Sequence, residues 1–165
     1  MNDSNQDSTT SQLLSVLISN DLAAIERIVA VLRRRGLGVT SWTILETENP
    51  GLLRIVCETD IDPAQFCQCI NQLEKIIDVV EVDSLRPGTY LALQVALIRL
   101  EAVGPNQDEA TVLVTLAGGR LLSLAFDSFI AELIGDRSGI DRTLASLNRL
   151  GNVEVVRTRL IAIRK

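Results

Sequence analysis

The sequence predicts an α+β fold made of two tandem ferredoxin-like βαββαβ units. Three observations predict it: strand-length apolar segments alternate with segments of helical periodicity, the same order occurs twice, and a Pro-Gly break at residues 85–88 separates the halves. Each unit forms a four-stranded antiparallel sheet with two helices on one face. Because 47% of the residues are hydrophobic, we expect a partner, most simply a second copy, to cover the open faces or the sheet edges.

Helix-capping residues and a turn predict the elements in the first half of the first unit. An apolar strand at residues 13–18 ends at Ser-Asn-Asp, residues 19–21, any of which can cap a helix. Gly36 is in the favoured position to end that helix, and residues 39–47 and 52–58 form a hairpin across a Pro-Gly turn. The buried stripe of the helix is Ile25, Ile28, Val29 and Leu32.

The second half of the first unit repeats the helix–strand order. Asp62 caps a helix with Pro63 at its first position, and residues 76–82 close the unit as a strand. The polar, acidic residues 1–11 are expected to be a disordered tail. The predicted domains are therefore residues 12–84 and 89–165, joined by a linker at 85–88.

The second unit follows the same order. A long strand begins near Leu91 and alternates apolar and other residues, and Gly104 to Glu109 opens a helix that Gly118-Gly119 ends. Strands at residues 120–126 and 129–134 follow. Ser138 is the predicted cap of the last helix, with Asp141 at the reciprocal position, and residues 153–163 form the last strand.

Composition excludes several classes of function. The net charge is −5, and a nucleic-acid-binding protein needs a concentrated positive patch, so nucleic acid is not an expected partner. No apolar run approaches the roughly 20 residues that span a bilayer. The first residues lack the basic and apolar regions of a signal peptide, and the predicted location is the cytoplasm.

Residue types exclude most catalysis. Without a histidine, the chain lacks the commonest general base, the Ser-His and Cys-His pairs, and most zinc sites. We therefore predict no catalytic and no metal-binding residues. Cys57, Cys67 and Cys69 are an odd number of cysteines and are expected to be reduced core thiols. Trp42 is expected in an interface or in core packing.

Four segments resemble a known family in order and spacing. They are LLSVLISND, IERIVAVLRRRGLGVTS, QLEKIIDVVEV and NVEVVRTRLIAI. The first unit resembles an ACT domain, a module that binds amino acids. Over nearly the whole chain after residue 11, the sequence resembles the small regulatory subunit of acetolactate synthase, with an ACT-like second domain.

This resemblance implies a function. It implies a non-catalytic homodimer that binds and activates the catalytic large subunit in branched-chain amino acid biosynthesis and makes it sensitive to valine. It also implies that thiamine diphosphate, magnesium and FAD are bound by the large subunit, with no cofactor in this chain.

The resemblance places an amino-acid site at the first helix. The family reads Glu-Asn-x-x-Gly before that helix and Gly-x-Asn-Ile after it, and the free N–H groups of the helix would hold the effector's carboxylate. Asn20 matches the first asparagine, whereas Ala23 replaces the glycine and Gly38 the second asparagine. The implied site residues are Asn20, Asp21, Leu22, Ala23, Ala24, Gly38 and Val39.

Two interpretations of this site stay open. It either binds valine or another amino acid with weakened or altered preference, or it only starts a helix. The alternative to a synthase subunit is a stand-alone ACT-type amino-acid sensor or scaffold. A small enzyme on the ferredoxin-like fold would need a cluster of acids, bases or phosphate-binding groups, which the sequence does not contain.

Overall fold

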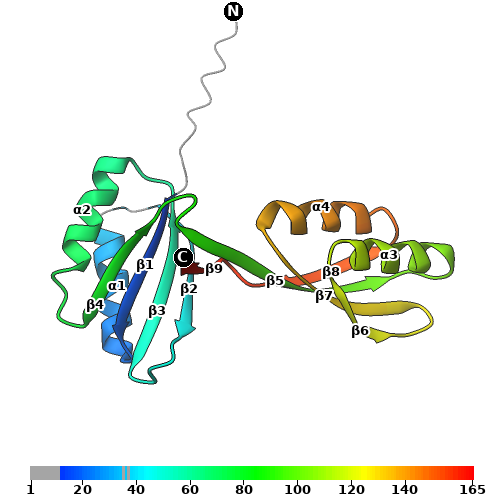
Figure 1. Cartoon of the computed structure of the whole chain (residues 1–165), viewed down its shortest axis with the longest axis horizontal. Coiled ribbons are helices and arrows are strands. Elements are labelled where there is room, and N and C mark those ends of the chain that lie inside the picture. Colours follow the sequence, from blue (N-terminus) through cyan, green and yellow to red (C-terminus); the bar gives the residue numbers. More distant parts are fainter. Residues whose placement is uncertain (1–11, 35, 37) are drawn as a thin grey trace, which may run out of the picture. The chain divides into compact units, whose positions relative to one another are not determined.

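The computed structural model describes residues 12–34, 36 and 38–165, which form two compact units (Figure 1). The first unit runs to Leu91 and also includes Ala162–Lys165, and the second is Ala92–Ile161. The boundary between the two units thus lies after the predicted linker at residues 85–88, and the limits of that linker stay a prediction. Among the described residues, no helix has the length and apolar composition needed to cross a membrane.

The first unit has the predicted βαββαβ order. Its elements are β1 (Gln12–Ser19), α1 (Leu22–Arg34), β2 (Val39–Glu46), β3 (Leu52–Thr59), α2 (Pro63–Leu73) and β4 (Val79–Leu85). The antiparallel strands lie in the order β2-β3-β1-β4, so β2 and β4 are the edges of the sheet. Residues from both helices and from one sheet face form a single buried core, as a ferredoxin-like unit requires.

Side-chain caps fix the start of both helices. The Asp62 carboxylate accepts hydrogen bonds from the N–H groups of Ala64 at 3.0 Å and Gln65 at 3.3 Å, which confirms the predicted cap of α2. At α1, Asp21 provides the equivalent group, because its carboxylate accepts from Ala23 N–H at 3.2 Å. Each helix therefore begins where a carboxylate accepts a hydrogen bond from a backbone N–H that has no partner within the helix.

The second unit repeats the topology. Its elements are β5 (Tyr90–Glu101), α3 (Pro105–Leu116), β6 (Arg120–Leu124), β7 (Ser128–Gly135), α4 (Arg137–Leu147) and β8 (Asn152–Arg157). A last strand, β9 (Ile161–Arg164), pairs with β5, but all its residues after Ile161 belong to the first unit. The main strands lie in the order β6-β7-β5-β8, the order of the first sheet. Helices α3 and α4 lie on one face of this sheet (Figure 1), and their buried residues join Ile98, Leu100 and Phe129 in a second core. The fold class predicted from the sequence is confirmed.

Two details of the second unit were predicted wrongly. Asp136, and not Ser138, caps α4, because the Asp136 carboxylate accepts from Gly139 N–H and from the Ser138 hydroxyl. The Asp136 carboxylate has two oxygens that can accept both hydrogen bonds. Ser138 lies inside the first turn of α4 and acts there as a donor. The predicted strand at residues 153–163 is interrupted, since it divides into β8 and β9. Thr158 N–H still donates to Val95 O, and the chain leaves this ladder after that bond.

Residues beyond the second unit cover part of the first sheet. Ala162 is buried, Arg164 forms an ion pair with Asp83 at 3.1 Å, and Lys165 N–H donates to Thr89 O. A cavity of about 330 Å³ on the open face is lined by Ala162 and Arg164 together with residues of the first sheet, among them Ser15 and Asp83. The chain itself therefore covers some of this face, and the expectation that a partner covers the rest stays a prediction.

The cysteines divide between the core and the surface. Cys57 and Cys69 are buried in the first core, whereas Cys67 is exposed on α2, so the prediction of three core thiols is wrong for Cys67. Residues two apart on a helix point in different directions, and only Cys69 faces the sheet. Burial, with a smaller contribution from Cys69, raises the pKa of Cys57 to about 12.

We expect one thiol per native chain to react with a thiol-specific reagent at pH 8, and three after denaturation. The thiolate is the reactive form, and a Cys57 pKa far above 8 together with burial keeps that thiol protonated and inaccessible. Counting the modified thiols with and without denaturant measures this, and Cys67→Ser is the control that should remove the native reaction. Rapid native labelling of Cys57 would contradict the burial described here.

Candidate functional site

The loop between β1 and α1 is held against the β2–β3 hairpin turn. Asn20 N–H donates to Gly51 O at 2.8 Å, and Asn20 Nδ2 donates to Pro50 O at 2.9 Å. The asparagine that matches the family motif thus uses one of its amide N–H groups to fix the loop. Its side-chain oxygen stays available as an acceptor.

Asp21 occupies the N-terminus of α1. Its carboxylate takes the Ala23 N–H, and its carbonyl oxygen accepts from Ala24 and Ile25 N–H. The carboxylate of an amino-acid effector would need the same backbone donors and would meet a like charge there. Leu22 is 71% exposed, whereas Ala24 is completely buried in the core. This geometry favours a helix cap over a carboxylate site in the loop as it stands.

A cavity of about 370 Å³ lies beside Asn20 and the hairpin turn. Glu46 and Glu48 line it, and both are exposed. Two carboxylates and the Asn20 side chain make this hollow suited to an ammonium group and unfavourable for an anion. An amino acid bound near Asn20 would therefore place its amino group, and not its carboxylate, toward the hairpin.

Gly38 and Val39 lie at the other end of α1. A helix of 13 residues is about 20 Å long, so these two positions are far from the group at residues 20–24 within one chain. Gly38 O accepts from Asp60 N–H at 3.1 Å, which fixes the entry into β2. The structure thus separates the predicted site residues into two groups. A site that contains both groups needs two copies of the chain.

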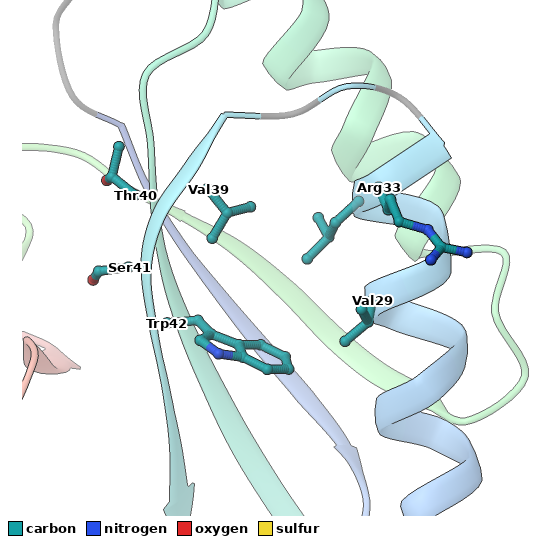
Figure 2. Close-up of a pocket in the computed structure, with 7 residues that line it drawn as sticks. Val29, Arg33, Val39, Thr40, Ser41 and Trp42 are labelled. Carbon is teal, nitrogen blue, oxygen red and sulfur yellow. The ribbon is translucent and has the colours of Figure 1, made fainter.

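A cavity of about 400 Å³ lies beside the second group, between α1 and the edge strand β2. Figure 2 shows the Trp42 ring facing Val29 across it, with Arg33 near one end. Trp42 is 40% exposed, so the cavity opens to solvent next to a strand edge that has no partner among the described residues. The full lining is Val29, Leu32, Arg33, Val39, Thr40, Ser41 and Trp42. An apolar hollow with one guanidinium can hold an apolar side chain and a carboxylate.

Of the residues that line this cavity, only Val39 belongs to the site predicted from the sequence. The missed residues come from α1 and β2, which the sequence does not place side by side. The sequence assigned Val29 to the buried stripe of the helix, whereas the structure leaves it partly exposed beside the edge strand. Among the described residues, no three Cys, Asp or Glu side chains converge as metal ligands would.

Both units match known families. A family model described as the small subunit of acetolactate synthase matches residues 94–165, and an ACT-domain model matches residues 20–82. The small subunit of acetolactate synthase isozyme 3 from Escherichia coli is 28% identical over 153 residues, which are 92% of this chain and 94% of that protein. A probable acetolactate synthase small subunit from Methanothermobacter thermautotrophicus is 27% identical over 149 residues, covering 88% of each chain.

A solved structure extends this likeness to three dimensions. The crystal structure of the acetolactate synthase small subunit from Thermotoga maritima superposes with a TM-score of 0.85 at 26% identity. The match covers 94% of this chain and 97% of that one. Both units and their order along the chain are therefore shared.

Proposed function

We propose that the chain belongs to the small-subunit family of acetolactate synthase, and on that premise that it is a regulatory subunit without catalytic residues of its own. It binds and activates the catalytic subunit in the biosynthesis of valine, leucine and isoleucine. The observation that carries this proposal is the likeness across both units, which spans 94% of the chain in one superposition. A protein of this kind acts by shifting an equilibrium in its partner.

The partner and its cofactors follow from the same premise. The large subunit would bind thiamine diphosphate, magnesium and FAD, and this chain would contribute an interface. We place the protein in the cytoplasm with that enzyme. Exposed surfaces of the first unit are where we expect the large subunit to bind.

We further propose that the chain forms a homodimer through the β2 edge. This edge strand, with the apolar cavity beside Trp42, offers both backbone hydrogen bonds and apolar contacts to a second copy. A dimer would also allow residues 20–24 of one copy and residues 38–39 of the other to belong to one effector site. The effector is valine or another amino acid, bound weakly because of Asp21, Ala23 and Gly38.

The test is acetolactate production by the purified large subunit of the same organism, with and without this chain, across a valine titration. We expect a severalfold stimulation, and valine inhibition only at concentrations well above those sufficient for a subunit with the complete motif. An equal concentration of chemically unfolded chain is the control. No stimulation together with no co-elution of the two proteins would overturn the proposal.

A stand-alone amino-acid sensor is the second candidate, and the altered effector loop favours it. Its distinguishing result is a chain that does not co-elute with the large subunit and yet binds an amino acid other than valine. Isothermal titration with the full set of amino acids separates the two proposals, because a synthase subunit co-elutes whether or not its effector loop binds.

A further inference from the structure

The second unit has an apolar sheet edge. Strand β6 (Arg120–Leu124) is at the end of the sheet, and Leu122, Leu124 and the following Phe126 are exposed. Phe126, in the turn to β7, is 90% exposed. Natural edge strands are usually protected by charges or prolines, and from Leu121 to Phe126 this edge has neither. The register shifts at Leu122, but the bulged residue is itself an exposed leucine. The bulge therefore adds apolar surface here.

Helix α3, which lies beside β6, is apolar on two opposite faces. Ala110 and Val114 are completely buried in the core of the unit. On the opposite side, Val112 is 55% exposed and Leu116 is 80% exposed. A helix at the surface of a globular protein usually carries polar residues on the side away from the core. The outer face of α3 thus resembles the inner face of an interface.

We propose that β6 and the outer face of α3, here called the β6–α3 surface, pack against the same surface of a second copy of the chain. In a two-fold arrangement, β6 pairs antiparallel with the partner's β6 and α3 packs antiparallel to the partner's α3. Large exposed apolar surfaces of this kind mark sites of protein association. This surface is separate from the β2 edge, and its assignment does not depend on the synthase as partner.

The distribution of charge identifies a second copy as the occupant. Asp108 and Glu109 lie in the first half of α3, Arg120 follows its last turn, and no charged residue lies between Glu109 and Arg120. Antiparallel packing of two identical helices brings the acidic end of each beside the Arg120 end of the other. Arg120 already pairs with Glu132 at 2.8 Å within its own chain and would bridge both carboxylate groups. A surface that complements itself in this way fits a copy of itself.

Site-specific disulfide formation tests this arrangement in the full chain. In a Cys67→Ser background, Val112→Cys is oxidised with copper phenanthroline, and two thiols from two chains lose two protons and two electrons to form one disulfide. Val112 lies on the outer face of α3, in the uncharged stretch between Glu109 and Arg120 where two antiparallel copies would cross, so two-fold packing brings its copies close together. We expect a linked dimer on a non-reducing gel at least tenfold faster than from the control Val156→Cys, which is 67% exposed in the same unit but lies outside the β6–α3 surface.

A second substitution distinguishes packing from random collision. Adding Leu116→Glu to the Val112→Cys chain places a charge on the interface and is expected to reduce the rate to that of the control. Because Leu116 is exposed, this variant should keep its far-UV circular dichroism. Equal rates at positions 112 and 156, or a rate that Leu116→Glu leaves unchanged, would overturn the proposal. No linked dimer, combined with loss of large-subunit co-elution in the Leu116→Glu chain, would assign the surface to that subunit and also overturn it.

Discussion

Valine affinity is expected to rise about tenfold or more when Ala23 is replaced by glycine and Gly38 by asparagine. The glycine removes a Cβ from the approach of the effector carboxylate to the first turn of α1. The asparagine adds a side-chain hydrogen bond, which contributes about 0.5–1.5 kcal/mol. A gain of about 1.4 kcal/mol corresponds to a factor of ten in Kd, so even partial success of the two changes is measurable.

The structure accommodates the substitution at Gly38. A Cβ there would lie 3.6 Å from Asp60 O, an ordinary van der Waals contact, and Gly38 does not have a positive φ. The substitution Asp21→Asn should add a further gain. It keeps a side chain that can cap α1 and removes the negative charge from the place where the effector carboxylate binds.

Isothermal titration calorimetry with valine measures the Kd of each variant. Ala64→Gly is the matched control, because Ala64 holds in α2 the position that Ala23 holds in α1, the second of the helix. That control reproduces the cost of a glycine in a first turn without touching the site. If the double variant binds valine no better than the natural chain, the loop is a helix start alone.

Gly151→Ala is expected to destabilise the second unit by about 2–3 kcal/mol, which corresponds to a fall in Tm of about 10 °C or more. A Cβ at Gly151 would lie 2.2 Å from Glu101 O and 3.1 Å from Ala102 Cβ. The oxygen belongs to the backbone of the central strand β5, so it cannot move aside without disturbing the ladders on both sides. The strain therefore remains in the folded state.

Gly135→Ala is the matched control in the same unit. Its Cβ would meet only Ile140 Cγ1, at 3.9 Å, and we expect a change of about 0.5–1 kcal/mol at most. Thermal unfolding followed by far-UV circular dichroism compares the two variants, and hydrogen exchange at β5 and β8 shows whether the loss is in the second unit. Equal Tm values for the two variants would contradict the contact at Gly151.

Much of the fold could be predicted because local signals agreed with long-range order. Asp62 before Pro63, Gly36 and the doubled strand–helix pattern each reflect backbone chemistry that the sequence displays directly. Competing local signals caused the errors. Asp136 and Ser138 are both good caps, and only the packed structure decides which one the helix uses. The break after Arg157 falls opposite a part of β5 that continues as a strand to Tyr90, so a strand pattern does not reveal it.

The candidate site was less predictable, for a physical reason. The positions of Asn20 and Gly38 could be read from the sequence, but the role of Asp21 at the Ala23 N–H is a matter of side-chain geometry. The cavity at Trp42 exists only because α1 and an edge strand lie side by side. Whether residues 20–24 and 38–39 act together is a property of an assembly, which a single sequence does not specify.

The return of Ala162–Lys165 to the first unit affects how the protein is made. Synthesis proceeds from the N-terminus, so the ribosome finishes the whole second unit before it adds the residues that pair with Asp83 and cover the first sheet. The first unit can collapse early, but this face is completed only after its neighbour has been synthesised. A chain stopped inside the second unit would therefore carry an unfinished first unit, which quality-control proteases could recognise by its uncovered sheet.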